Sequence, residues 1–484
     1  MLNFKSDLNK VNCNKLTPMF LLFCLISFVY NLSRPLKISL AIGAKESGAE
    51  IIPFLKLWGI LPCAFIFTCL FIVLSNKTSR ENVFYIFIGI FISFFALFKY
   101  YLYPNLDNLV LTEFSLYLKG ILPLGAKGFI EAIYYWPISL FYILAELWGT
   151  IILYTLFWGF ANEVTKLNNA KKVYALFAFS SNLSVAIAGY IGITLSNSNY
   201  TWEYTFSTLL NTILVTGILI AIVFKYMHIT NKIDINEAVK TQEKTITKLK
   251  SKKMSLSESL KSIFQSKYLL YIAIIVISYN IATNLGETLW TAKMKELYHE
   301  DKSKIASYIY YVTMYMGLIA MPVDLFVTRY TLKNRGWTFT ALITPIVFLL
   351  TGLLFYFSVI SSYFELTTTE MNILGLPLSN AIILLGAFHI CITRAARASV
   401  MDASKEMAYI PLDLEEKRKG KAVIDSISSR LGKAGGSTIY QVLLISFGTM
   451  AATTPYIVGI IVLLSFAWIY AVKEIGIKVE QHLK

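Results

Sequence analysis

Long apolar stretches alternate with short polar ones along most of the chain. A membrane-spanning helix needs about 20 largely apolar residues, because each residue rises 1.5 Å through a hydrocarbon layer of about 30 Å. Such stretches are 16–33, 57–76, 82–98, 132–162, 173–202, 204–224, 268–286, 305–323, 336–364, 371–393 and 434–472. The last is long enough for two helices, divided near Gly448 and Pro455, and we extend the first of these backward through Lys421. The pattern predicts an all-α polytopic membrane protein with about twelve transmembrane helices.

A single long polar segment divides these helices into two groups of six. We expect an N-terminal tail (1–17), a six-helix bundle (18–226), a basic linker (227–267), a second six-helix bundle (268–473) and a C-terminal tail (474–484). Two such bundles are the outline of transporters whose halves rock around a site at mid-membrane. The lysine-rich linker lacks interleaved aromatic residues, so we expect it to face anionic lipid headgroups and not nucleic acid.

Composition narrows the class of protein. The chain is 56% hydrophobic and only 15% charged, whereas soluble domains are roughly 25% charged. This balance excludes a soluble enzyme and a disordered chain. Of the 44 Lys and Arg residues, 31 fall in the termini and the even-numbered inter-helix loops, against 8 in the odd-numbered loops. Positive loops stay cytoplasmic, so both termini are predicted to be cytoplasmic.

Catalytic and metal-binding patterns are not visible. The five cysteines and four histidines have neither disulfide-framework nor zinc-ligand spacing, so we expect no metal and no cofactor. The Gly432-Lys433 pair does not form a phosphate-binding P-loop, because Ile427 stands where that motif requires glycine and Ala434 where it requires Ser or Thr. The sequence therefore does not indicate an ATP-hydrolysing pump.

Seven charged residues lie within the predicted helices, each at a cost of about 2.5 to 3.5 kcal/mol at the bilayer centre. They are Arg34, Lys37, Lys56, Glu146, Glu287, Arg430 and Lys433. These groups could pair with one another and lock helices together, but two acids cannot neutralise five bases. We interpret the surplus as the lining of a water-filled cavity that binds a polyanion. For Lys56, near a helix end, we favour a stem that snorkels to the interface.

Three glycines, Gly432, Gly435 and Gly436, surround Lys433. Their lack of side chains would let a ligand approach the backbone closely. Arginine offers a planar fork to phosphate oxygens and lysine a mobile point charge, so this segment suits a phosphorylated ligand. Small residues also promote close helix packing in membranes, and the sequence leaves both interpretations open for the glycines.

Three longer segments carry a family resemblance. They are GAEIIPFLKLWGILP (48–62), ELWGTIILYTLFWGFAN (146–162) and KEMAYIPLDLEEKRKGKAVID (405–425), the last running on to RLGKAGG. Together they resemble the nucleotide transporters of obligate intracellular bacteria and plastids, the ATP/ADP translocases that are unrelated to the mitochondrial carrier. The resemblance implies a major-facilitator-like fold and exchange of ATP for ADP by alternating access, with phosphate accompanying ADP in some members.

The resemblance also implies functional positions. Family positions used in transport match Lys37, Glu146, Glu287 in NLGExxW, and Lys433 in RLGKxGG. The predicted substrate-binding set is Lys37, Arg34, Glu146, Glu287, Asn284, Arg430, Lys433, Gly435, Gly436 and Lys56. The expected partners are nucleotide and membrane lipid, the expected state is a monomer, and the expected location is a bacterial inner membrane.

Departures from the family pattern leave the nucleotide open. Family members often carry Asp after the first-helix lysine, where this chain has Ile38, and residues 397–404 also differ from the common pattern. Exchange of GTP, CTP or UTP, proton-coupled nucleotide import, and transport of another phosphorylated anion remain alternatives. The charged segment 405–421 would act as a gate or as an amphipathic interfacial helix.

Overall fold

The computed structural model describes residues 13–45, 47–164, 167–196, 200–248, 266–364, 372–373, 375–412, 424 and 429–483. Nearly all of these residues are helical. The two short strands, β1 (Asn372–Ile373) and β2 (Leu376–Pro377), pair antiparallel. Gly375 between them has a φ of 75°, which glycine adopts without steric cost. The predicted all-α class is confirmed.

The N-terminal half of the molecule runs from α2 to α12. Its elements are α2 (Cys13–Ile42), α3 (Ile51–Phe54), η1 (Leu55–Ile60), α4 (Leu61–Lys77), α5 (Arg80–Leu97), η2 (Phe98–Leu102), α6 (Leu106–Leu109), α7 (Thr112–Ile121), η3 (Leu124–Ala126), α8 (Lys127–Tyr134), α9 (Trp136–Trp148), η4 (Gly149–Phe157), α10 (Trp158–Val164), α11 (Leu167–Leu195) and α12 (Trp202–Lys248). Helix α12 continues into the stretch predicted as linker, and residues 249–265 of that stretch lie outside the described part.

The C-terminal half runs from α14 to α22. Besides β1 and β2, its elements are α14 (Lys267–Tyr298), α15 (Lys302–Pro322), η5 (Val323–Thr328), α16 (Arg329–Asn334), α17 (Gly336–Tyr363), α18 (Leu378–Ala396), η6 (Arg397–Met401), α19 (Asp402–Ala408), α21 (Ser429–Phe447) and α22 (Met450–Leu483).

Ten helices in the described residues are long and apolar enough to cross a membrane. Two further apolar helices, Phe179–Leu195 and Ala434–Phe447, are shorter. The chain is thus a multi-pass membrane protein, whereas helix length and composition do not establish the predicted number of twelve spans.

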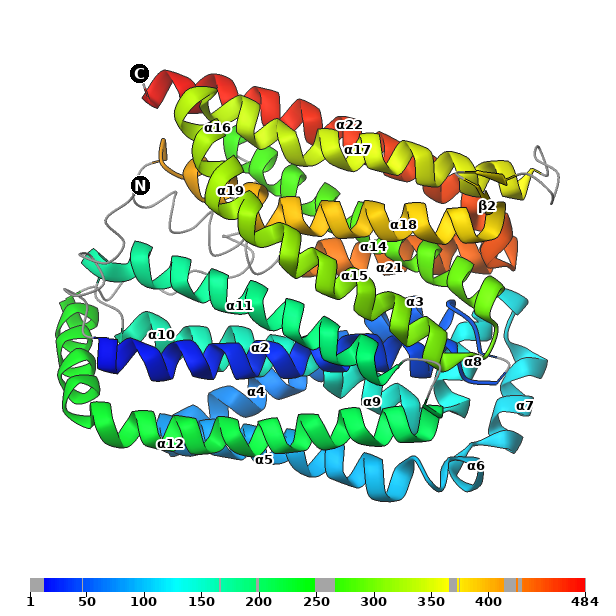
Figure 1. Ribbon diagram of the computed structural model, residues 1–484, viewed down its shortest axis with the longest axis horizontal. Coiled ribbons are helices and arrows are strands. Elements are labelled where there is room, and N and C mark those ends of the chain that lie inside the picture. Colours follow the sequence, from blue (N-terminus) through cyan, green and yellow to red (C-terminus); the bar gives the residue numbers. More distant parts are fainter. Residues whose placement is uncertain are drawn as a thin grey trace.

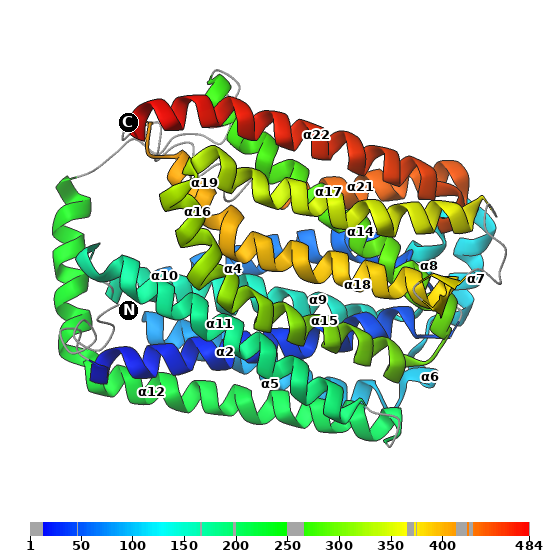
Figure 2. The same ribbon diagram turned by 45° about the horizontal axis from the view of Figure 1, so that its top comes forward.

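The long helices lie side by side along one axis, with the N-terminal half below the C-terminal half in Figure 1. Helix α2 begins and α22 ends at the same end of the bundle, on the left, which we call the terminal end. The elements α6, α7, α8 and β2 lie at the opposite end, which we call the far end. The view in Figure 2 keeps this arrangement.

Each half has its own aromatic core. In the N-terminal half, Phe98 stacks on Phe141 with ring centroids 4.5 Å apart, and Trp148 lies edge-on to Phe91. In the C-terminal half, Phe348 packs against Trp468. Because each core is built from the helices of one half, the two halves can behave as separate packing units.

The halves approach each other closely where small residues face backbone. Gly317 on α15 lies against the backbone of Ala186 on α11, and Gly189 on α11 lies against that of Met314. Nearby, the hydroxyl of Tyr310 donates a hydrogen bond of 2.7 Å to the carbonyl of Leu32. Small residues allow such close helix contact in membranes.

Several long helices contain π-helical segments, a feature frequently found at functional sites because it changes the direction in which side chains point. Segment η1 carries Lys56, η4 carries Tyr154 and η6 carries Arg397. All three lie on helices that contribute to the site described next.

Candidate functional site

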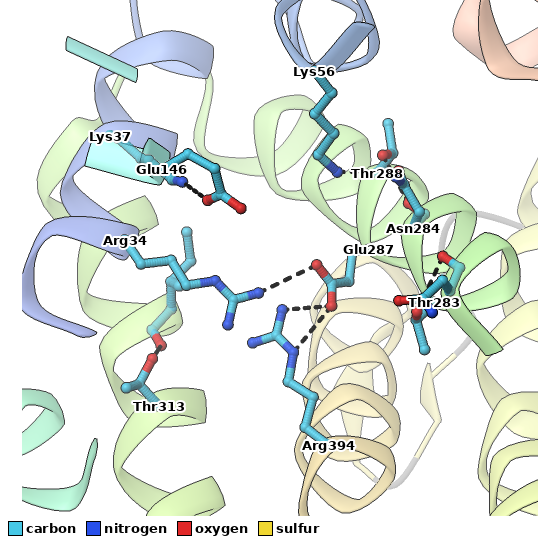
Figure 3. Close-up of polar contacts among 12 residues, drawn as sticks. Arg34, Lys37, Lys56, Glu146, Thr283, Asn284, Glu287, Thr288, Thr313 and Arg394 are labelled. Carbon is cyan, nitrogen blue, oxygen red and sulfur yellow. Dashed lines mark hydrogen bonds and ion pairs between the residues drawn. The ribbon is translucent and has the colours of Figure 1, made fainter. Parts of the chain in front are cut away.

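One carboxylate joins the two halves of the molecule. Arg34 on α2 donates a hydrogen bond of 3.3 Å from Nη2 to Oε2 of Glu287 on α14. Arg394 on α18 donates to the other oxygen, Oε1, from Nη2 at 2.6 Å and from Nε at 3.0 Å. Figure 3 shows the two guanidinium groups converging on Glu287. A single acidic side chain therefore lies between two arginines, one from each half.

A second ion pair lies within the N-terminal half. The ammonium group of Lys37 on α2 contacts the carboxylate of Glu146 on α9. The same ammonium lies 4.7 Å from the ring centroid of Tyr142, one helical turn before Glu146, as in a cation–π contact. Lys37 is only 2% exposed. The carboxylate of Glu146 and the ring of Tyr142 thus stabilise the charge of Lys37 inside the bundle.

Lys56 also reaches across the two halves. Its Nζ donates a hydrogen bond of 3.0 Å to Oδ1 of Asn284 on α14, one turn from Glu287 (Figure 3). The expectation that Lys56 snorkels to the membrane interface is wrong. Because it lies on the π-helical segment η1, near the C-terminal half, a polar partner inside the bundle is within its reach.

We name these six residues the central charge cluster: Arg34, Lys37, Lys56, Glu146, Glu287 and Arg394. It contains four basic and two acidic side chains. Arg34 and Glu287, which meet between the halves, are 19% and 27% exposed, so water reaches the cluster. A water-accessible site with surplus positive charge and two arginine forks is suited to bind a polyanion such as a chain of phosphates.

Arg430 and Lys433 lie at the start of α21, and their side chains lie outside the described part of the structure. The glycines beside them are described. A Cβ on Gly432 would lie 2.6 Å from Cβ of Asn280, and one on Gly436 would lie 3.1 Å from Cβ of Asn284. These two glycines thus allow α21 to pack closely on α14. Gly435 has more space, with its nearest neighbour Ile281 at 3.6 Å.

Arg394 and Arg397 were not among the residues singled out in the sequence. They follow the apolar run 371–393 directly, so the apolar pattern by itself places both beyond the end of the predicted helix. In the structure α18 continues through Arg394 and η6 begins at Arg397, which brings both arginines inside the bundle. The continuation of helical periodicity past the apolar run was the only signal that could have indicated this.

A separate charged group lies at the far end, outside the candidate spans. Lys127 on α8 forms ion pairs with Glu50 at 3.1 Å and Glu131 at 3.3 Å. Burial raises the pKa of the Glu131 carboxyl to about 7, with Glu50 adding to the rise and Lys127 opposing it. This group borders a pocket of about 550 Å³ that Lys295 of the C-terminal half also lines.

The charged segment 405–421, predicted as a gate or an interfacial helix, is only partly described. Lys405 and Glu406 belong to α19, and the chain turns at Tyr409 to Leu412. Residues 413–423 lie outside the described part, so neither interpretation is tested.

Solved structures with the same arrangement of helices are transporters. A bacterial homologue of the iron transporter ferroportin, in an inward-facing state, superimposes with a TM-score of 0.59 over 98% of this chain and 99% of its own, at 12% identity. The fold is thus major-facilitator-like, as predicted. Two halves with a site between them are the arrangement in which secondary transporters bind their substrates.

The chain belongs to the TLC ATP/ADP transporter family, which matches residues 5–479. It is 35% identical to ADP,ATP carrier protein 1 of Chlamydia pneumoniae over 471 residues, covering 96% of this chain and 90% of the relative. It is 34% identical to the chloroplastic ADP,ATP carrier protein 1 of Arabidopsis thaliana, covering 95% and 73%. The resemblance seen in the sequence is confirmed.

Proposed function

We propose that this protein exchanges ATP for ADP across a bacterial inner membrane by alternating access. The observation that carries the proposal is the central charge cluster between the two halves, where two arginines share one carboxylate and positive charge is in surplus. Membership of the TLC family supports the same activity. Nothing in the described site favours another nucleotide or another phosphorylated anion.

We assign the binding of phosphates to Arg34, Lys37, Arg430 and Lys433, with Lys56 and Asn284 bordering the site. In this scheme Glu287 holds Arg34 and Glu146 holds Lys37 in position while the site is empty. Gly435 and Gly436 lie next to Lys433 on α21. Gly436 faces Asn284, so its contribution is the close packing of α21 on α14.

Competition for the arginines explains why substrate would be released and not trapped. A phosphate group that enters the cluster requires the same guanidinium N–H groups that Glu287 occupies in the empty site. As phosphate leaves, the carboxylate replaces it on both arginines. The internal carboxylate therefore lowers the net affinity of the site for a highly charged ligand.

Obligate exchange follows from the same charge balance. Enclosing an empty cluster would remove surplus positive charge from water, and the desolvation of uncompensated charge in a low-dielectric interior is unfavourable. A bound nucleotide supplies the missing negative charge. We therefore expect the loaded protein to change state rapidly and the empty protein slowly.

We propose that the terminal end faces the cytoplasm, since positive loops remain there, and that the protein works as a monomer. Close contacts between halves, such as Gly189 with Met314 and Gly125 with Leu444, lie toward the far end. In this orientation these contacts lie on the side of the molecule away from the cytoplasm.

Uptake into proteoliposomes tests the proposal. Labelled ATP should enter vesicles preloaded with ADP and should not enter empty vesicles. Equal uptake into empty and preloaded vesicles would contradict exchange and favour proton-coupled import. A panel of unlabelled GTP, CTP, UTP, phosphate and sugar phosphates, added outside, identifies any competing substrate.

A further inference from the structure

Tyr154 is an exposed side chain in the interior of the bundle. It lies on the π-helical segment η4 of the N-terminal half and is 64% exposed. Its charged neighbours are nevertheless Arg397, Asp402 and Lys405 of the C-terminal half, together with Glu146 of its own. Charged groups of both halves therefore act on this one ring.

Arg397 and Tyr279 form a stacked pair within the bundle. The guanidinium carbon of Arg397 lies 4.9 Å from the ring centroid of Tyr279 on α14, in a cation–π arrangement. Tyr279 is only 2% exposed and is held edge-on by Trp468, with 5.6 Å between ring centroids. The arginine therefore lies on a fixed aromatic platform, and Tyr154 is among the groups that interact electrostatically with it.

These three residues form a second layer beside the central charge cluster. Tyr279 precedes Glu287 by eight residues and so lies about 12 Å from it along the helix axis. Tyr154 follows Glu146 by eight residues, about two turns, most of them on the π-helical segment η4. Both displacements are toward the terminal end. Arg397 is displaced in the same direction, one turn beyond Arg394 on the same helical rod.

An aromatic layer and a phosphate-binding layer at this separation match the two ends of an extended nucleotide. Nucleobases stack on tyrosine rings and on the planes of arginine guanidinium groups, whatever the sequence of donors and acceptors at their edges. Phosphates require N–H donors and positive charge, which the central charge cluster supplies.

We propose that Tyr154, Tyr279 and Arg397 form the subsite that holds the nucleobase, a purine ring, while the triphosphate extends to the central charge cluster. This inference rests on the proposed nucleotide exchange. The nucleotide then lies along the bundle axis with its base toward the terminal end. Stacking contacts the face of the ring, so this subsite discriminates purines from smaller pyrimidines more strongly than adenine from guanine.

The test compares a ligand that has a base with one that has none. Exchange of labelled ATP is measured in ADP-loaded proteoliposomes, and inorganic tripolyphosphate serves as the base-free competitor. The variants are Tyr154→Ala, Tyr154→Phe and Arg397→Gln. Tyr470→Ala is the matched control, because Tyr470 is 56% exposed on α22 and packs on Tyr271, away from the site.

Loss of one stacking ring should raise the ATP concentration for half-maximal uptake by roughly 5-fold to 100-fold in Tyr154→Ala. Inhibition by tripolyphosphate should stay within about twofold of the wild type, and ATP should lose most of its advantage over UTP as a competitor. Tyr154→Phe, which keeps the ring, should retain most of the ATP affinity that Tyr154→Ala loses, and Tyr470→Ala should behave like the wild type. Arg397→Gln should resemble Tyr154→Ala, which keeps the test valid if the alanine variant does not fold.

Three results would overturn the subsite. One is unchanged half-saturation by ATP in both Tyr154→Ala and Arg397→Gln. Another is a parallel loss of tripolyphosphate inhibition in Arg397→Gln, which would make that arginine a phosphate ligand. The third is a wild type that tripolyphosphate does not inhibit, which would contradict the two-layer arrangement. Failure of the wild type to exchange ATP at all would instead overturn the proposed function.

Discussion

Glu287 accepts a hydrogen bond from Arg34 across the boundary between the two halves, at 3.3 Å, while Arg394 holds its other oxygen. The two partners are 253 residues apart in the chain. Transport requires the halves to move relative to each other. The contact between Arg34 and Glu287 therefore couples the charges of the substrate site to the relative position of the halves.

Removal of the shared carboxylate should impair exchange. In Glu287→Gln the guanidinium groups of Arg34 and Arg394 face each other without a counter-ion, so we expect ATP exchange to fall by at least about tenfold. The melting temperature should also fall, and adding Arg34→Gln to Glu287→Gln should recover part of it. Glu296→Gln, at an exposed carboxylate paired with Lys293, is the control. Additive effects of the two substitutions would contradict a functional bridge.

Lys433 gives a direct test of the phosphate assignment. Lys433→Ala should abolish measurable nucleotide uptake while the protein stays folded and inserted, because a positive group that binds phosphate is lost. Uptake of labelled ATP and detergent gel filtration are the two measurements. Lys119→Ala, at an exposed position on α7, should have wild-type uptake. Full activity of the Lys433 variant would remove this residue from the site.

Substitution of Lys56 tests whether this lysine acts in the substrate site or anchors its helix at the membrane interface. Since its ammonium contacts Asn284 across the halves, Lys56→Ala should raise the ATP concentration for half-maximal uptake by roughly tenfold, about 1.4 kcal/mol, with little change in membrane insertion. Lys56→Arg should retain more of the affinity. If Lys56→Ala instead reduces insertion and leaves ATP affinity unchanged, the lysine serves the membrane interface.

The glycines of α21 should differ in their tolerance of a methyl group. Gly432→Ala places Cβ 2.6 Å from Asn280, so α21 must move away from α14 and the melting temperature should fall. Gly435→Ala meets its nearest atom at 3.6 Å and should be neutral or stabilising, because alanine favours helix by about 1 kcal/mol over glycine. Equal effects of the two substitutions would show that close packing is not what Gly432 provides.

Glu131 should make stability depend on pH near neutrality. Its pKa rises from 4.5 in the unfolded chain to about 7 in the fold, so the folded state binds more protons between these values. Its contribution therefore favours the fold below about pH 4.5, and is lost as the pH rises through about 7. Relative to wild type, Glu131→Gln should show a smaller fall in melting temperature between pH 5 and pH 8.5. Indistinguishable pH profiles would contradict this assignment.

The amino-acid sequence alone predicted the membrane class and most of the charges that lie inside the bundle. Apolar length and the cost of a charge inside a span are local properties, so they can be read along the chain without knowledge of contacts. Lys37, Glu146 and Glu287 were identified in this way, and family motifs pointed to the same residues. The sequence did not predict Arg394, because the helix continues past the end of the apolar run at Thr393.

Only the tertiary structure decided which charges meet. Whether Glu287 pairs with Arg34, with Arg394 or with both depends on the rotation and depth of three helices from two halves. The same holds for Lys56, which turns inward to Asn284, and for Gly432, which faces another helix. Contacts between residues hundreds of positions apart are set by how helices pack, and packing depends on the shapes of all neighbouring side chains together.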